Sequence, residues 1–192
     1  MIRKILFLVC TISFTHAAKI PLFDHYPFLE KQISHVSLGS FPTPIIHVPS
    51  FSKLSRVYVK CDNLSGLLTE KGRLFGGNKV RKLEFLLSDA LHKGATTMLT
   101  LGGTGSNHAV ATSEYAHQLG LGCLALLYPQ SKSFTVQRNL LLHSYYGTQL
   151  YDASECTMEQ LYQRNASEEN VYVIPMGGSN TIGVLGFVNA AF

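Results

Sequence analysis

Hydrophobic positions in the middle of the chain alternate between two periods. Some stretches are continuous apolar runs of strand length, and 56–60 alternates in the manner of a β-strand. Between these stretches, apolar residues recur at three- and four-residue spacing, which predicts helices. The predicted strands are 56–60, 96–101, 122–128, 148–152 and 171–175, and the predicted helices are 80–93, 108–119, 134–147 and 156–165.

This alternation predicts an α/β fold. Continuous apolar strands are typical of parallel sheets, which are buried on both faces, and helices of this length suit right-handed crossovers. We expect a parallel twisted sheet flanked by helices, with ligands at the carboxyl ends of the strands. Two earlier segments lack the pattern. Residues 19–55 are predicted to be an irregular lead-in with one candidate strand within 45–51, and 61–78 is a long loop that suggests function or disorder.

The N-terminus is predicted to be a separate segment. Basic "MIRK", apolar "ILFLVCTISF" and small-residue "THAA" follow the layout of a secretory signal peptide over residues 1–18. The apolar run is about half of the ~20 residues that a membrane-spanning helix needs, so we expect no membrane anchor after cleavage. Cleavage would make the protein periplasmic or secreted. The alternative is a buried N-terminal strand behind a wrong start codon, in a cytoplasmic protein.

Composition narrows the function classes. Hydrophobic residues make up 46% and charged residues 15% of the 192 residues, which is typical of a globular protein. The net charge is +4, and no run of Lys and Arg is interleaved with aromatic residues, so nothing favours nucleic-acid binding. The cysteines are widely spaced, without any C-x-x-C, which indicates neither a zinc site nor a disulfide scaffold; they are Cys10, Cys61, Cys123 and Cys156.

Two glycine-rich turns lead into predicted helices, "GGNK" at 76–79 and "GGTGSNH" at 102–108. Neither fits a nucleotide-binding motif. The phosphate loop of nucleotide hydrolases needs Gly-Lys followed by Ser or Thr, but Asn78 precedes the lysine here and no hydroxyl residue follows it. The dinucleotide motif needs a third glycine at the position of His108.

The physical alternative is an anion site. Where a helix begins, unpaired N–H groups and the positive end of the dipole face outward, and this suits a carboxylate. Ser106 and Asn107 are equally suited to plain N-capping. Lys79 also stands at a helix start, which favours its neutral, nucleophilic amine and hence a Schiff base with a carbonyl. The alternative for Lys79 is an ordinary solvated lysine, as we expect for Lys82.

At this point the residues resemble a known family. The stretch "GGNKVRKLEFLLSDALHKGATTMLTLGGTGSNHAVATSEYAHQLGLGCLALL" resembles the D-cysteine desulfhydrase and 1-aminocyclopropane-1-carboxylate deaminase family. These are pyridoxal-phosphate enzymes of the tryptophan-synthase β type. The resemblance extends from "RVYVK" to "IPMGGSNTIGVLGFVNAA". It rests on the combination of "GNKVRKLEFL" with "GGTGSNH", which is far more specific than either motif alone.

The resemblance implies roles for five residues. Lys79 matches the lysine that forms the internal aldimine with the cofactor, and Asn78 belongs to the same motif. Ser106, Asn107 and His108 match a turn that holds the substrate carboxylate. In that turn the Asn side chain contacts the cofactor's ring hydroxyl, and the Ser takes part in proton handling. His108 in place of Gln is closer to the desulfhydrase branch.

The implied reaction is β-elimination or deamination of a small amino acid. Lys79 would act as base at the α-carbon. A desulfhydrase would release pyruvate, ammonia and sulfide, whereas a cyclopropane deaminase would release 2-oxobutanoate and ammonia. The implied partners are a small amino-acid substrate and either a second copy in a homodimer or a complementing C-terminal polypeptide.

The resemblance also implies a domain division. Residues 19–78 would be the N-terminal part of the large domain, 79–176 the small α/β domain, and 177–192 the segment that returns to the large domain. "GGSNTIG" at 177–183 is interpreted as a structural turn within that segment. Family members continue past Phe192 with the glycine-rich loop for the cofactor phosphate. A non-catalytic remnant that cannot hold the cofactor is therefore the alternative function.

Overall fold

The computed structural model describes residues 20–49, 57–70, 72–165 and 170–192. The predicted signal peptide lies outside these ranges and stays a prediction. Within them, no helix combines the length and the apolar character needed to cross a bilayer.

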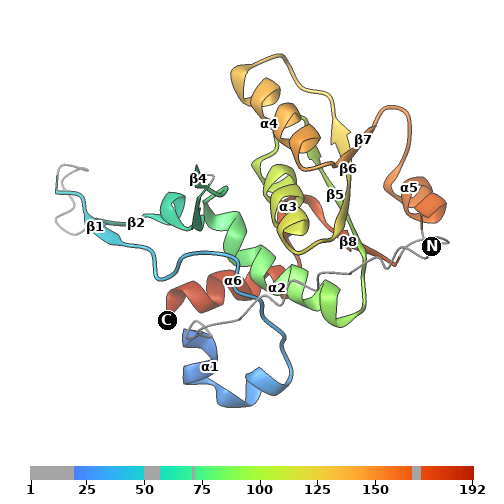
Figure 1. Ribbon diagram of the computed structural model, residues 1–192. Helices are drawn as coiled ribbons and strands as arrows, with labels where there is room; N and C mark the ends of the chain where they lie inside the picture. Colours follow the sequence, from blue (N-terminus) through green and yellow to red (C-terminus); the bar gives the residue numbers. More distant parts are fainter. Residues whose placement is uncertain (1–19, 50–56, 71, 166–169) are drawn as a thin grey trace, which may run out of the picture.

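A four-stranded parallel sheet forms the centre of the molecule (Figure 1). The strand order is β7-β6-β5-β8. The strands lie within one or two residues of the predicted ones at each end, because continuous apolar runs are buried between layers of helices. They are β5 (Thr97–Gly103), β6 (Gly122–Tyr128), β7 (Gln149–Asp152) and β8 (Val171–Ile174). The predicted α/β fold is confirmed.

Helices cover both faces of the sheet, and alternate strand residues divide between them. Met98 and Cys123 pack with α2 and α3, whereas Leu99 and Leu124 pack with α5 on the opposite face. Right-handed crossovers explain this division. The chain runs in one direction from β5 through β6 to β7, and then in the opposite direction to β8, which lies on the other side of β5 in the same sheet. Reversing the direction of travel moves a right-handed crossover to the opposite face. The helices are α2 (Asn78–His92), α3 (Asn107–Gln118), α4 (Phe134–Tyr145) and α5 (Met158–Asn165).

The return from β7 to β8 creates a switch point between β5 and β8. From β5 the chain continues through the turn 104–106 into α3, which leads to the neighbouring strand β6. From β8, on the other side of the switch point, it continues into η3 (Met176–Gly178) and α6 (Thr181–Ala191). In open α/β sheets, ligands bind at the carboxyl ends of the strands at such a point. The topology therefore predicts a ligand site at the carboxyl ends of β5 and β8.

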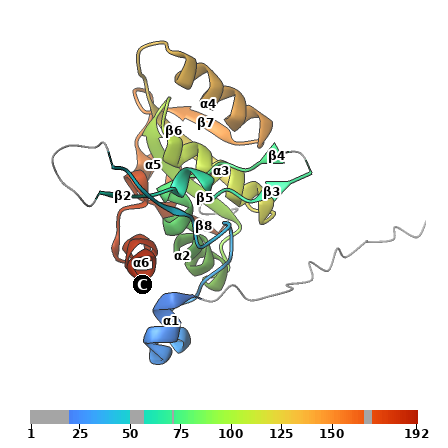
Figure 2. The same cartoon turned by 90° about the vertical axis from the view of Figure 1, so that its left-hand side faces the viewer.

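Two predictions about the N-terminal region were wrong in part. The lead-in is not wholly irregular, because it contains α1 (Pro21–His25) and η1 (Pro27–Lys31). The segment 61–78 was predicted to be a long loop, but it contains regular structure: η2 (Asp62–Leu64) and a small hairpin, β3 (Leu68–Thr69) with β4 (Gly72–Arg73). The candidate strand is confirmed as β1 (Ile45–His47), which pairs antiparallel with β2 (Tyr58–Lys60) apart from the main sheet (Figures 1 and 2).

Helix α6 lies along α2, and the two backbones come very close. A Cβ on Gly186 would stand 2.2 Å from the carbonyl oxygen of Arg81, so only glycine allows this approach. The end of the chain thus packs on the helix that carries Lys79 (Figure 1). The domain limits at 78/79 and 176/177 stay predictions.

Candidate functional site

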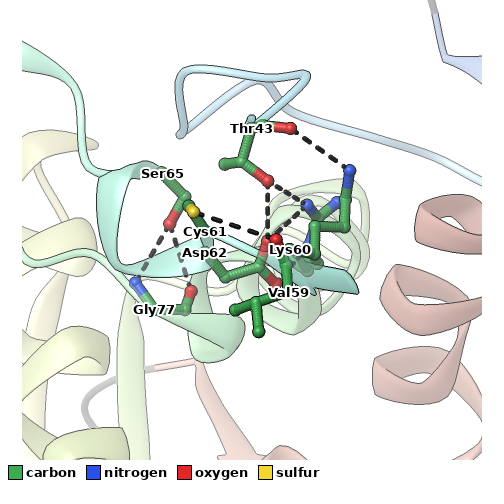
Figure 3. A network of polar contacts seen from close by, with 8 residues as sticks. Thr43, Val59, Lys60, Cys61, Asp62, Ser65 and Gly77 are labelled. Carbon is green, nitrogen blue, oxygen red and sulfur yellow. Dashed lines mark hydrogen bonds and ion pairs between the residues drawn. The ribbon is translucent and has the colours of Figure 1, made fainter. Parts of the chain in front are cut away.

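The loop 61–77, which precedes α2, holds the start of this helix in place. Gly77, with φ of 112°, donates its N–H to the Ser65 hydroxyl at 3.0 Å and to the Asp62 carbonyl at 2.8 Å. The Ser65 hydroxyl donates in turn to the Gly77 carbonyl at 3.2 Å (Figure 3). The helix starts at Asn78, two residues earlier than predicted, and Lys79 therefore lies in a first turn whose lead-in is fixed from both sides.

An ion pair adds a second anchor to the same helix start. The buried Arg81 guanidinium donates twice to the Asp62 carboxylate, at 2.7 Å each. The Thr43 hydroxyl donates to the same carboxylate at 2.8 Å (Figure 3). The hydrogen bond from Arg81 holds the pKa of Asp62 below its ordinary value, against the opposing effect of burial. The loop and α2 are thereby joined next to Lys79.

The glycine turn after β5 carries Ser106 and Asn107. The Ser106 hydroxyl accepts from the Ala109 N–H at 3.2 Å, so this residue is the N-cap of α3. A Cβ on Gly102 would stand 2.7 Å from Ser106, which explains the glycine. Among the described residues, no acceptor meets the N–H groups of Asn107 and His108. Capping and anion binding are therefore compatible at this turn, because the cap uses only one of the available donors.

Asn107 is exposed, and its side chain is held from α4. Its Oδ1 accepts from Arg138 Nη2 at 3.4 Å and from Asn139 Nδ2 at 3.3 Å. Sequence reasoning missed both partners, since 134–147 was interpreted only as an amphipathic helix. The sequence carries no signal for Asn139, because Thr135, Val136 and His143 in the same helix have a similar helix propensity.

His108, the second residue of α3, is buried. The residue is 3% exposed, and neither ring nitrogen has a hydrogen-bond partner among the described residues. A Cβ on Gly178 would stand 2.9 Å from His108 Cε1, so the turn after β8 contacts this ring. Burial, and then the positive charges of Lys79 and Lys82, lower the pKa of His108 to about 4. The histidine is therefore neutral at pH 7, and Lys79 lies close enough to influence it.

Lys82 is not the solvated lysine that we expected. It is 6% exposed, and its Nζ donates to the Gly177 carbonyl at 3.0 Å and to the Ser179 hydroxyl at 2.9 Å. Burial, followed by the charge of Lys79, lowers its pKa. Lys82 thus ties α2 to the turn after β8. The start of α3, with Ser106, Asn107 and His108, and the helix α2, with Lys79 and Lys82, therefore both adjoin the turn after β8.

A family model described as "Pyridoxal-phosphate dependent enzyme" matches residues 36–192. The chain belongs to this pyridoxal-phosphate-dependent family. It is 39% identical over 165 residues to a Pyrococcus horikoshii protein named "Putative 1-aminocyclopropane-1-carboxylate deaminase", covering 81% of this chain and 48% of the relative. A solved structure described as an ACC deaminase homologue matches with a TM-score of 0.73 and 33% identity, covering 90% of this chain and 52% of that one. The chain therefore spans about half the length of the relatives that it matches.

The donor set at the switch point fits pyridoxal phosphate, the cofactor of this family. The cofactor is an anion that carries an aldehyde and a ring hydroxyl. A lysine amine, two backbone N–H groups at a helix start and an asparagine side chain suit those groups in chemistry. The buried, unpartnered nitrogens of His108 add polar capacity that the described residues leave unused.

Proposed function

We propose that this chain belongs to an enzyme that uses pyridoxal phosphate to eliminate or deaminate a small amino acid. The observation that carries the proposal is that the helix of Lys79 and the start of α3 both contact the turn after β8: Lys82 donates to Gly177 and Ser179, and Gly178 lies against His108, in a chain whose family is established. The substrate class follows from relatives named for 1-aminocyclopropane-1-carboxylate deamination.

The residues of this chain would divide the work as follows. Asn107 and the N–H groups at the start of α3 would bind the substrate carboxylate and orient the cofactor ring. Lys79 would hold the cofactor at rest and carry the proton to or from the substrate α-carbon. Ser106, at the same helix start, would relay a proton at the substrate. Neutral His108 would shield the floor of the site from water. When bound, pyridoxal phosphate supplies a ring that stabilises negative charge at the α-carbon.

Two reactions are consistent with this arrangement. D-cysteine and water would give pyruvate, ammonia and hydrogen sulfide, with the thiolate as leaving group and water supplying the oxygen of the ketone. 1-Aminocyclopropane-1-carboxylate and water would give 2-oxobutanoate and ammonia. We favour the deaminase reaction, because both relatives carry that name.

Cofactor attachment tests the proposal directly. The full chain is incubated with pyridoxal phosphate, reduced with borohydride and digested, and the labelled peptide is identified by mass spectrometry. We expect the label on Lys79 in the parent protein, and none in Lys79→Ala. Lys93→Ala is the matched control, because Lys93 is 61% exposed at the other end of α2. An unlabelled parent protein would favour the non-catalytic alternative, and equal labelling of Lys79→Ala would remove Lys79 from its role.

Product analysis then separates the two reactions. Sulfide release from D-cysteine and 2-oxobutanoate release from 1-aminocyclopropane-1-carboxylate are measured on the full chain loaded with pyridoxal phosphate and not reduced with borohydride. Faster release of 2-oxobutanoate supports the deaminase assignment. Faster sulfide release would transfer the assignment to the desulfhydrase branch.

An exposed apolar ribbon suggests where a partner binds. On β1 and β2, Ile45 and Tyr58 lie on one face and Ile46 and Val59 on the other, and these four residues are between 44% and 63% exposed. We propose that further large-domain polypeptide covers this ribbon, since exposed apolar groups of this kind mark interaction surfaces. Light scattering on the purified chain tests the alternative, because a dimer mass that Ile45→Asp abolishes would assign the ribbon to a second copy.

A further inference from the structure

We infer that Asn139 is a positioning residue for the ligand site, which holds the glycine turn and fixes the direction of the Asn107 side-chain amide. The inference rests on the proposed function for its consequence, but its structural part concerns this chain alone. Asn139 lies in the middle of α4, is 0% exposed and touches the turn through its side chain.

The contacts of Asn139 leave its amide only one orientation. Its Oδ1 accepts from Arg138 Nε at 3.2 Å and from Nη2 at 3.0 Å, and a guanidinium can only donate. Its Nδ2 donates to the Gly105 carbonyl at 2.9 Å, and a carbonyl can only accept. Because both ends of this chain of hydrogen bonds are unambiguous, the oxygen and nitrogen of Asn139 cannot exchange places.

This orientation determines that of Asn107. Both Asn139 Nδ2 and Arg138 Nη2 are donors directed at Asn107, at 3.3 Å and 3.4 Å, so the atom that faces them is the oxygen. The Nδ2 of Asn107 is therefore turned away from α4, and no described residue accepts from it. An asparagine that presents its N–H₂ group can donate to an oxygen of a ligand, such as a ring hydroxylate, whereas the flipped side chain would present an acceptor instead.

The burial of Asn139 argues for more than a helix-surface role. An exposed asparagine in a helix would be satisfied by water, but a fully buried one keeps its place only through its partners. Its two donated bonds go to the turn that connects β5 with α3, and to the first residue of α3. The helix α4 thus fixes in advance a turn that would otherwise have to be ordered by the ligand.

Two substitutions separate this role from general packing. Asn139→Ala removes all four contacts. Asn139→Asp keeps the volume and the acceptor for Arg138 but cannot donate to Gly105, and it gives Asn107 a reason to turn its Nδ2 toward α4. Asn170→Ala is the matched control, because Asn170 Nδ2 also donates to two backbone carbonyls, those of Lys93 and Gly94, at the opposite end of the sheet.

The first measurement is amide hydrogen exchange of the full chain without cofactor, read over peptides that contain 102–110. Losing the bond that Asn139 donates to Gly105 should make exchange of the turn roughly fivefold faster in Asn139→Asp, and we expect exchange to be faster still in Asn139→Ala. In Asn170→Ala, exchange of the turn should equal that of the parent protein. Unchanged exchange in Asn139→Asp with a parental circular dichroism spectrum would overturn the inference. This outcome is independent of whether the chain binds pyridoxal phosphate.

The second measurement is the affinity for pyridoxal phosphate, followed by its change in fluorescence in a double-mutant cycle. We expect Asn139→Asp to weaken binding roughly tenfold in the parent background and to have a clearly smaller effect in the Asn107→Ala background, where only the bond to Gly105 is left to lose. Equal effects in both backgrounds would show that Asn139 does not act through Asn107. If Asn139→Ala does not fold, the isosteric Asn139→Asp decides the result.

Discussion

Breaking the contact between Arg81 and Asp62 should destabilise the loop that carries the chain into Lys79. The perturbation is Arg81→Met, which keeps an unbranched aliphatic side chain but removes the guanidinium group. This group lies over the Phe41 ring, donates to Thr43 at 3.2 Å and donates twice to the Asp62 carboxylate at 2.7 Å. Among the described residues, Asp62 would keep only the hydroxyl of Thr43 as a side-chain donor.

The burial of the two side chains determines the expected magnitude. Removing one partner of a fully buried ion pair costs about 3–5 kcal/mol, whereas exposed pairs contribute about 0.2–1 kcal/mol. The Arg81 side chain is 6% exposed, but that of Asp62 is 20% exposed, so water partly replaces the lost contact. We therefore expect Arg81→Met to lower the free energy of unfolding by about 2–3 kcal/mol, with a coupling energy to Asp62→Asn of about 2 kcal/mol.

The assay is urea denaturation of the parent protein, both single variants and the double variant at pH 7. Lys93 and Asp89 provide a matched cycle, because this pair has the same separation of 2.7 Å but the Lys93 side chain is 61% exposed. Its coupling energy should be about 0.3–0.5 kcal/mol. If the cycle of Arg81 and Asp62 gives a coupling energy no larger than this, burial does not strengthen the pair and the reasoning is refuted.

Three further predictions concern the same region and the core. The lowered pKa of Asp62 in the folded state means that its contribution to stability is present above pH ~4 and is lost as the pH falls through the folded pKa; urea midpoints at pH 7 and pH 3 should therefore differ less in Asp62→Asn than in the parent protein. Gly178→Ala should lower the free energy of unfolding by about 2–4 kcal/mol, because φ is +63° and the new Cβ would stand 2.9 Å from His108 and 3.0 Å from Leu86. Gly120→Ala, at φ +72° with nothing within 4 Å, should lower it by only about 1–2 kcal/mol, and equal thermal shifts of the two variants would contradict the steric part of this reasoning. Burial raises the pKa of Cys123 to about 11, so its thiol should react with Ellman's reagent at pH 8 only after unfolding, and mass spectrometry should find it unmodified in the folded chain.

The sheet could be predicted from the sequence because its signal is local. Residues 122–128 are apolar at nearly every position, and the strand that they form has its five central residues buried. A buried helix segment can also be continuously apolar, but the length of this run and the flanking glycines and Pro129 favour a strand. The same argument fails for the hairpin β3–β4, whose strands are two residues long and exposed, so that no hydrophobic pattern marks them.

The site was predictable as a set of motifs, but not as a set of contacts. Glycines and capping residues pointed to the turns at 76–79 and 102–108, since the requirements of a helix start are local. The burial of Lys82 depends on a carbonyl 95 residues away, and that of Asn139 on a turn 34 residues away. A polar residue in a helix looks the same in the sequence whether it faces water or a distant loop, so these two residues could be recognised only in the fold.

The charges that meet at the switch point explain why an anion belongs there. Lys79 and Lys82 are three residues apart on α2, hence on one face of the helix, and the charge of Lys79 lowers the pKa of both Lys82 and His108. Lys82 carries the same sign of charge and is bound to uncharged acceptors in the turn after β8, and His108 is neutral, so neither balances the charge of Lys79. The starts of α2 and α3 add further positive potential. A bound phosphate-bearing cofactor would supply the missing negative charge, and the two residues that hold the turns, Lys82 and Asn139, keep the donors in place before it arrives.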